Sequence, residues 1–167
     1  MTSSRSIVLG LAVAALVTAA DQATKWWIVW VVMHPPQVIR VAPFFNLVLG
    51  WNRGVSFGIL NTDSAVAPWL LVLIASAIVV VLVVWLAKAE SRFVAVALGF
   101  VMGGAAGNVI DRVRFGAVAD FLDFHAFSYH WPAFNVADSA ITVGAIALIA
   151  DSLFRRPGRS KIPPQNN

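Results

Sequence analysis

The sequence predicts an all-α integral membrane protein: a bundle of four transmembrane helices, with a small β-rich segment on the outer (periplasmic) side between helices 1 and 2. Two observations lead to this fold class. Of the 167 residues, 59% are hydrophobic and only 12% are charged, about half the charged fraction of an average soluble domain. The apolar residues are also grouped in runs of the length that crosses a bilayer, about 20 residues. This composition excludes intrinsic disorder, and the absence of cysteine excludes disulfides, thiol nucleophiles and iron–sulfur clusters.

The first predicted helix covers residues 7–33. Arg5 and the apolar run 7–20 also fit a cleavable signal peptide. However, apolar sequence rich in tryptophan resumes a few residues later, so we expect one retained helix. Asp21 and Lys25 lie four positions apart on one face of this helix, where they can pair with each other instead of meeting lipid singly.

Three further apolar runs predict transmembrane helices, and they cover residues 65–87, 93–112 and 138–154. The first of these runs contains no charged residue, whereas the last is short and has an Asp near each end. The middle run carries glycines at a spacing of four, at Gly99, Gly103 and Gly107. A double G-x-x-x-G pattern lets a neighbouring helix approach closely, so we expect helix packing along this stripe.

The distribution of Lys and Arg predicts the orientation, because cytoplasmic loops are enriched in these residues. With the N-terminus inside, the inner side holds Arg5, Lys88, Arg92, Arg155, Arg156, Arg159 and Lys161. The longer outer segments hold only Arg40, Arg53, Arg112 and Arg114. We therefore expect both termini, including the tail 155–167, in the cytoplasm. The formal net charge of +4 then reflects a cytoplasmic surplus and does not indicate binding of nucleic acid.

Two outer segments connect the helices. Residues 34–64 contain two β-prone runs, 38–41 and 44–51, which are broken by Pro and Gly and predict a small sheet on the membrane surface. We expect this aromatic segment to cradle a lipid or a peptide at the interface. Residues 113–137 are rich in aromatic side chains but less regular, and they predict an outer loop. We expect residues 1–167 to form a single integral membrane domain.

Two acidic residues stand out, because charged side chains at the edge of a membrane span are costly and are candidates for function. Asp120 has aromatic and aliphatic neighbours, a setting that raises the pKa of a carboxyl group by desolvation. Asp138 opens the last helix, where it also fits a capping box with Asn135 that would serve the helix end alone. Together the two carboxyl groups can divide acid and base work on a substrate carbonyl. Such a pair needs no metal and no cofactor.

Other interpretations remain open from the residues alone. Residues 54–58 match G-x-S-x-G, the serine hydrolase elbow, although no obvious helix follows them. His125 and His130 can bind a metal together with Asp123, but interfacial solvation explains them more simply. Asp111 can form an ion pair with Arg112 that ends the third helix, and the two share a face with Asn108 if that helix continues. A proton-coupled transporter would carry an acid near the middle of a span, whereas the polar residues here gather at one side.

Five short motifs follow one another along the chain: residues 21–25 (DQATK), 52–58 (NRGVSFG), 103–112 (GGAAGNVIDR), 116–121 (GAVADF) and 134–138 (FNVAD). Each motif alone is modest, but five of them in this order on a chain with four predicted spans are highly specific. From about residue 7 to 154, the chain resembles bacterial lipoprotein signal peptidase (signal peptidase II), a family of four-helix membrane aspartic proteases.

The resemblance implies that Asp120 and Asp138 are the catalytic pair. It also implies that further residues line or support the active site, namely Asn52, Gly54, Asn108, Arg112, Asn135, Asp21 and Lys25. The implied activity is an endopeptidase that removes the signal peptide from diacylglyceryl-modified prolipoproteins, cutting just before the lipidated Cys. One departure is Val55-Ser56, where many members have two alanines, and this puts local substrate contacts in doubt.

The resemblance also implies a place in the cell. The protein would be a multi-pass protein of the bacterial inner membrane, with its active site at the outer side and with membrane lipids around it. We expect inhibition by globomycin-type cyclic peptides, and we expect a monomer.

Overall fold

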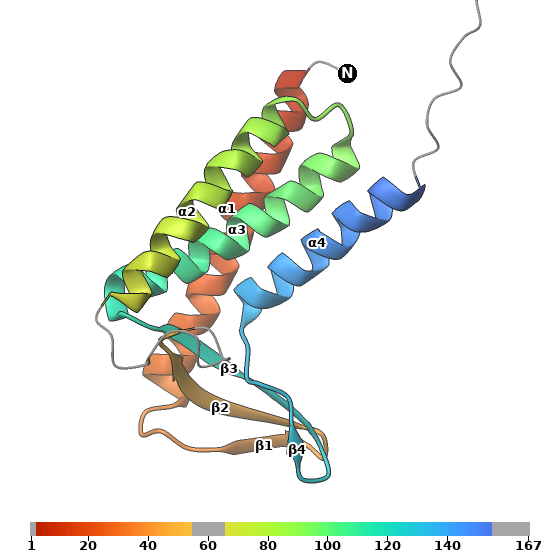
Figure 1. Cartoon of the computed structure of the whole chain (residues 1–167). Coiled ribbons are helices and arrows are strands. Elements are labelled where there is room, and N and C mark those ends of the chain that lie inside the picture. Colours follow the sequence, from red (N-terminus) through yellow and green to blue (C-terminus); the bar gives the residue numbers. More distant parts are fainter. Residues whose placement is uncertain (1–2, 55–65, 155–167) are drawn as a thin grey trace, which may run out of the picture.

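The computed structural model describes residues 3–54 and 66–154. Its elements follow one another as α1 Ser3–Trp27, the π-helical turn η1 Ile28–Val32, β1 Ile39–Ala42, β2 Phe45–Asn52, α2 Ala67–Ala87, α3 Arg92–Phe115, β3 Val118–Ala126, β4 Tyr129–His130 and α4 Val136–Phe154. The long helices run beside one another, and the strands lie across one end of them (Figure 1). Both ends of the described chain lie at the other end of the helices (Figure 1).

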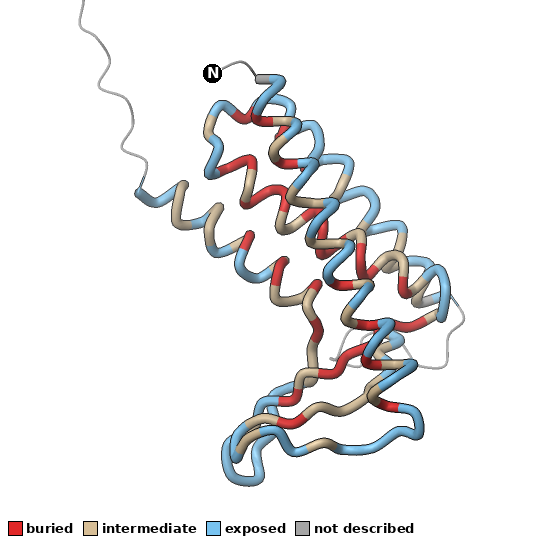
Figure 2. The backbone as a smooth tube through the Cα atoms, turned by 180° about the vertical axis from the view of Figure 1, so that it is seen from behind, coloured by how far each residue is buried: buried red, intermediate tan, exposed pale blue. Residues whose placement is uncertain are grey.

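The helices have the dimensions and the surface of membrane spans. Those long and apolar enough to cross a membrane are Ser4–Val32, Pro68–Ala87, Arg92–Phe115 and Val136–Phe154. Buried positions face the interior of the helix group and exposed positions face outward (Figure 2). The outward positions include large apolar side chains such as Leu73, Val81 and Ile146, as a lipid-facing surface requires. The chain therefore has the four apolar helices that the sequence predicts.

The first helix is continuous across the point where a signal peptide would end. α1 runs through residues 7–20 without a break and is extended by η1 to Val32. The amide of Met33 then donates to the carbonyl of Ile28 at 2.8 Å and ends the helical segment. The two apolar halves that the sequence leaves ambiguous thus belong to a single helix.

The glycine stripe of α3 packs against α1, as the spacing predicts. A Cβ on Gly99 would lie 2.6 Å from the carbonyl oxygen of Gly10, and one on Gly103 would lie 2.6 Å from that of Ala14. Gly104, one position further round, meets the backbone of Ala137 on α4. Because small residues on two faces let two helices approach at once, α3 is the central helix.

The third helix continues beyond the predicted end at residue 112. It runs to Phe115 and stops at Gly116, which has a left-handed φ of 68° and donates its amide to the carbonyl of Arg112 at 3.0 Å. The alternative in which Asp111 pairs with Arg112 and so ends the helix finds no support, because Asp111 pairs with Lys25 of α1. A glycine C-cap therefore ends this helix.

The sheet is antiparallel, with strand order β1-β2-β3-β4. The expectation of an irregular loop over residues 113–137 is wrong, because this segment provides β3 and β4. The first five residues of β3, 118–122, are almost all buried. The alternation of apolar and polar residues that reveals a half-exposed strand is therefore missing there. The β-prone runs of residues 34–64 form β1 and β2, while residues 55–64 lie outside the described part of the chain.

The sheet rests on the end of the first helix. Ile28 of η1, Met33 and Phe121 of β3 form a buried apolar cluster, against which Leu47 and Leu49 of β2 also pack. In β2 and β3, Gly50 faces Asp120 and Asn52 faces Val118. This packing places the beginning of β3 beside the ends of α3 and α4, where the polar residues gather.

Candidate active site

Asp120 is the third residue of β3 and is only 5% exposed. Its two carboxyl oxygens have separate donors from different elements. The side-chain amide of Asn52, at the end of β2, donates to Oδ2 at 3.1 Å, and that of Asn135 donates to Oδ1 at 2.7 Å. The carboxyl group is thus held in a fixed orientation although it is buried.

Asp138 lies in the first turn of α4 and takes part in the predicted capping box. Its backbone amide donates to Oδ1 of Asn135 at 2.9 Å, and the backbone amide of Asn135 donates to Oδ2 of Asp138 at 3.3 Å. The side-chain amide of Asn108 on α3 donates to the other oxygen of Asp138, Oδ1, at 2.8 Å. Asp138 is half-buried, so capping does not consume the carboxyl group: it also faces the polar site.

Asn135 joins the two carboxyl groups. It is fully buried, its side-chain amide contacts Asp120, and its backbone amide contacts Asp138. The same side chain also donates to Oδ1 of Asn108 and to the carbonyl of Ala119, both at 3.3 Å. The structure therefore brings Asp120 and Asp138, which are distant in sequence, to one site on either side of a single asparagine.

Arg112 provides positive charge next to these carboxyl groups. Its Nη1 donates to the carbonyl of Asn108, one turn earlier on α3, at 3.3 Å. It interacts electrostatically with Asp138, Asp120 and Asp111. Its Nε is buried without a hydrogen-bond partner among residues 3–54 and 66–154. A guanidinium with an unused donor beside two carboxyl groups is suited to bind a carbonyl or carboxylate oxygen of a substrate.

A second cluster supports the site from α1. Lys25 lies 2.9 Å from Asp21, four residues earlier, which confirms the predicted pairing. It lies equally close to Asp111 on α3, and its Nζ donates to Oδ1 of Asn108 at 2.9 Å. Asp21 in turn accepts from the backbone amide of Ala137 on α4 at 2.9 Å. The cluster therefore ties α1, α3 and α4 together directly behind the two candidate carboxyl groups.

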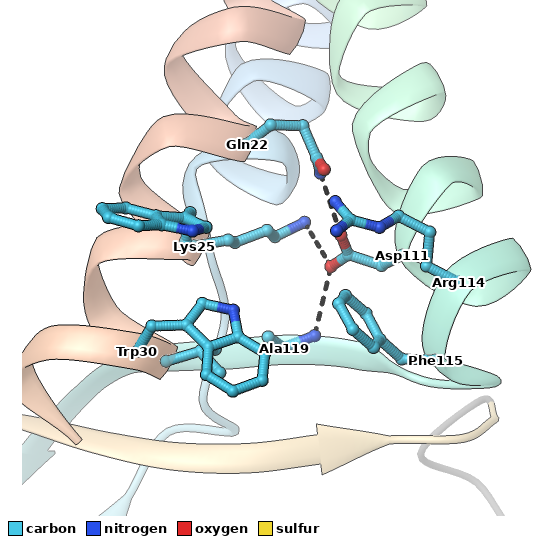
Figure 3. Close-up of a pocket in the computed structure, with 9 residues that line it drawn as sticks. Gln22, Lys25, Trp30, Asp111, Arg114, Phe115 and Ala119 are labelled. Carbon is cyan, nitrogen blue, oxygen red and sulfur yellow. Dashed lines mark hydrogen bonds and ion pairs between the residues drawn. The ribbon is translucent and has the colours of Figure 1, made fainter. Parts of the chain in front are cut away.

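Figure 3 shows a hollow between α1, α3 and β3, which Lys25 and Asp111 of this cluster line. Lys25 and Gln22 both reach toward Asp111, which also accepts the backbone amide of Ala119 at 3.3 Å. Gln22 donates to Oδ1 of Asp111 at 2.8 Å and to the carbonyl of Gly107 at 3.2 Å. Gln22 and Asp111 were not predicted as site residues. Asp111 carried a signal, since it is a charge in a membrane helix, but Arg112 next to it suggested a local partner.

Asn52 and Gly54 stand at the edge of the site. The backbone amide of Gly54 donates to Oδ1 of Asn52 at 3.2 Å, which orients the asparagine so that its Nδ2 reaches Asp120. Val55 and Ser56, where the sequence departs from the family pattern, lie outside the described residues. The G-x-S-x-G match therefore falls mostly outside them as well.

The electrostatics distinguish Asp120 from its neighbour on the same strand, Asp123. Burial raises the pKa of Asp120 to about 6. The charge of Asp138 also acts to raise this pKa, whereas the hydrogen bond from Asn52 acts to lower it. Burial also acts to raise the pKa of Asp123, but the hydrogen bonds from Asn46 and His130 outweigh it and hold this pKa below its usual value. Asp120 is therefore the carboxyl group of the sheet that can hold a proton near neutral pH.

The histidines do not gather as a metal site. Nδ1 of His130 lies 2.8 Å from Oδ1 of Asp123, and the rings of His130 and His125 stack with their centroids 4.8 Å apart. Among residues 3–54 and 66–154, no three His, Cys, Asp or Glu are placed to hold a metal ion. The alternative of metal binding by His125, His130 and Asp123 thus finds no support. His130 is exposed, in keeping with the solvation expected for it, and it also contacts Asp123.

The chain matches one protein family over most of its length. The family model described as signal peptidase (SPase) II matches residues 13–154. The chain is 46% identical over 162 residues to the lipoprotein signal peptidase of Nitrobacter hamburgensis, covering 94% of this chain and 97% of that protein. It is also 46% identical over 160 residues to the lipoprotein signal peptidase of Methylorubrum extorquens, covering 94% and 91%.

Solved structures agree in fold. A bacterial membrane enzyme determined by the in meso method at 1.9 Å resolution is similar with a TM-score of 0.75 and 34% sequence identity, covering 88% of this chain and 94% of that chain. A second such structure, at 2.3 Å resolution, gives a TM-score of 0.73 at 33% identity, covering 91% and 94%. The match to the family model and the similarity to these relatives lead to one conclusion: the chain belongs to the signal peptidase II family.

Proposed function

We propose that this protein is an aspartic endopeptidase in which Asp120 and Asp138 activate a water molecule. Membership of the signal peptidase II family makes it a membrane protease that cleaves the signal peptide of prolipoproteins. We further propose that the scissile bond lies just before the cysteine that carries diacylglycerol. The observation that carries the proposal is that Asn135 holds both carboxyl groups at one site.

The geometry supports the division of labour that such a pair needs. Each carboxyl group is oriented by donors on both oxygens, so neither needs to reorganise during the reaction. The raised pKa of Asp120, about 6, allows one proton to be shared between the two groups near neutral pH. Asn52, Asn108, Asn135 and Arg112 then orient the pair and the substrate, while Asp21 and Lys25 hold the helices that carry them.

The proposed reaction has two steps. One carboxylate takes a proton from water, the water oxygen bonds to the scissile carbonyl carbon, and the other carboxyl group gives its proton to the carbonyl oxygen. The resulting gem-diol then collapses. The first carboxyl group returns its proton to the leaving nitrogen as the carbon–nitrogen bond breaks, and the second recovers a proton from a hydroxyl. A new carboxyl terminus and a free amine result, and the enzyme returns to its starting state.

The position of the site suits a lipid-modified substrate. Asp120 and Asp138 lie where the sheet meets the ends of α3 and α4, at the edge of the apolar spans. A substrate whose cysteine is anchored by acyl chains would reach this depth without leaving the bilayer. We propose that this end faces the outer side of the bacterial inner membrane and that β1 and β2 help to cradle the lipid or the peptide.

The direct test replaces each carboxyl group of the proposed dyad. Asp120→Asn and Asp138→Asn should each lower cleavage of a diacylglyceryl prolipoprotein by purified protein by at least about 10³-fold, because an amide cannot transfer the proton. Both variants should remain inserted and folded, as judged by circular dichroism and thermal unfolding in detergent. The matched control is Asp123→Asn, on the same strand but paired with Asn46 and His130, which should retain turnover. Near-normal cleavage by either dyad variant would refute the aspartic mechanism.

A serine hydrolase mechanism makes the opposite prediction for Ser56. Under the proposed mechanism Ser56→Ala should leave turnover largely intact, within about three-fold, because the family pattern tolerates alanine at this position. Under the elbow mechanism the variant should be inactive. Single-turnover assays on the same prolipoprotein distinguish the two.

Several further properties follow from the family relationship as part of the proposal. We expect globomycin-type cyclic peptides to inhibit cleavage, surrounding membrane lipids to contact the exposed apolar faces, and the protein to act as a monomer without a metal or other cofactor.

A further inference from the structure

We propose that Lys25 is a positioning residue: through the side-chain amide of Asn108, it holds Asp138 as the ionised member of the dyad, which acts as the base. The inference rests on the proposed dyad and deepens it, because it assigns different roles to the two carboxyl groups. Lys25 itself lies on α1, is 4% exposed, and contacts neither Asp120 nor Asp138 in the hydrogen bonds and ion pairs of the described residues.

The contacts of Lys25 include one that charge balance does not require. An ammonium group has three donors, and Lys25 has three partners at 2.9 Å: Asp21, Asp111 and Asn108. The two carboxylates already more than neutralise the lysine. Its third donor is directed at the neutral amide oxygen of Asn108, a residue that does not line the hollow of Figure 3. This third contact is the one that leads toward Asp138.

The two ends of the Asn108 amide face groups of opposite charge. Oδ1 accepts from Lys25 at 2.9 Å, and Nδ2 donates to Oδ1 of Asp138 at 2.8 Å. If the amide were reversed, its NH₂ group would face an ammonium and its oxygen would face a carboxylate. Lys25 therefore selects the orientation in which Asp138 receives an N–H group. Asn135 also donates to Oδ1 of Asn108, but at the longer distance of 3.3 Å.

This arrangement favours a carboxylate at Asp138. Both members of the dyad accept hydrogen bonds on both oxygens, and such donors stabilise the charged form. Asp120 is only 5% exposed whereas Asp138 is half-buried, so burial opposes a charge more strongly at Asp120. The donor to Oδ1 of Asp138 is the Asn108 amide. The ammonium at the far end of the amide polarises it and strengthens its N–H group as a donor. The shared proton is then left on Asp120. The charge of Lys25 also acts directly on Asp120 and favours its ionised form, but burial and the charge of Asp138 act the other way and keep the pKa of Asp120 raised. Other charged groups near the pair are Arg112, Asp21 and Asp111.

The first experiment removes the positive charge of Lys25 without leaving the cluster unbalanced. Lys25→Met alone would strand two buried carboxylates, so it is combined with Asp111→Asn. The charges of Lys25, Asp21 and Asp111 add to −1, and in the double variant Asp21 alone gives −1. Asp111→Asn alone is the matched control, because it keeps the contact between Lys25 and Asn108. Cleavage of a synthetic diacylglyceryl prolipoprotein peptide is measured from pH 4 to 9 for each variant.

The expected result is a shift that a merely structural role would not produce. Relative to Asp111→Asn, the double variant should lose on the order of ten- to hundred-fold in kcat, with KM nearly unchanged because Lys25 does not touch the substrate. The acidic limb of its kcat/KM profile should move to higher pH, because the base now gains a proton more easily. An acidic limb that stays in place would overturn the proposal.

The second experiment tests the route through Asn108. Asn108→Ala removes the donor to Asp138 but leaves the ion cluster intact, so it should move the acidic limb in the same direction, whether or not the double variant folds. In a protein that carries both Asn108→Ala and Asp111→Asn, the further change Lys25→Met should not move the acidic limb again. A full additional shift, or an unmoved limb in Asn108→Ala itself, would show that Lys25 does not act through this amide. If instead Asp120→Asn or Asp138→Asn remains active, the dyad fails, and that result is read independently of the Lys25 profiles.

Discussion

Asn135 connects the two members of the proposed dyad through its side chain and its backbone. Its side chain binds Asp120 and its backbone amide binds Asp138, while its own Oδ1 caps α4. The sequence indicated the cap, because Asn and Asp three residues apart before an apolar run form a recognisable pattern. It did not indicate that the same asparagine reaches β3, since that contact depends on how the strand and the helix are packed. Helix capping and dyad assembly are therefore two results of one local structure.

Asn52 tunes Asp120, and its removal should have a distinctive effect on pH dependence. Asp120 has a pKa of about 6, above the ordinary value of 3.8, and the hydrogen bond from Asn52 acts to lower it. The folded state binds this proton more tightly than the unfolded state. The contribution of Asp120 to the free energy of unfolding therefore falls as the pH rises from about 4 to about 6. Activity that requires protonated Asp120 is lost as the pH rises through about 6.

Asn52→Ala should move the basic limb of the kcat/KM profile to higher pH, by roughly 0.5–1 unit, because the bond that favours ionised Asp120 is gone. The control is Asn46→Ala, which removes the equivalent donor from Asp123 on the same strand and should leave the basic limb unchanged. A limb that moves to lower pH in Asn52→Ala would mean that Asp120 is not the acid.

Close packing of α3 on two sides carries the site, and it depends on where side chains are absent. Gly103 lies against the backbone of α1, and Gly104 lies against the backbone of α4. The glycine spacing made this packing predictable from the sequence. The strand β3 was not predictable in the same way, because its first half is buried on both faces and shows no alternation. Elements whose sequence shows a regular spacing of residues could thus be recognised, whereas β3, which carries Asp120, could not.

Gly103→Ala should destabilise the protein even though alanine favours helix formation. A Cβ at this position would lie 2.6 Å from the carbonyl oxygen of Ala14 and 2.7 Å from Cβ of Val17, so α1 and α3 would have to separate. We expect a loss of about 1–3 kcal/mol, measured by denaturant unfolding in mixed micelles. Ala15→Leu, on the exposed face of α1, adds more volume and should change stability by less than about 0.5 kcal/mol. Equal effects would show that helix contact is not what limits this position.

The two ends of the helix group differ in structure. The sheet and the polar cluster lie at one end, and both ends of the described chain lie at the other (Figure 1). Composition, span positions and the pairing of Asp21 with Lys25 could all be derived from the sequence, because each follows from the cost of charge in lipid. The partners of Asp111 could not be derived, because Lys25 and Gln22 approach it from a helix more than 80 residues earlier.

The natural absence of cysteine allows the predicted orientation to be tested with single substitutions. Ser128→Cys, in the turn between β3 and β4, should react with a membrane-impermeant maleimide added to spheroplasts, because we expect this end outside. Ser4→Cys, at the start of α1, should react only after the membrane is opened. Both positions are exposed, so accessibility of the side chain is matched. The reverse pattern of labelling would place the sheet in the cytoplasm.

The contacts of Asp21 and Asn135 also bear on how the enzyme comes into being. Asp21 of α1 holds the backbone of Ala137, and Asp138 itself belongs to α4, the last helix of the chain. During synthesis, a chain that still lacks α4 has only one of the two proposed catalytic carboxyl groups and no Asn135 to orient it. On the proposed mechanism, proteolysis therefore begins only when the last span joins the first, and an incomplete chain cannot cleave the proteins inserted around it.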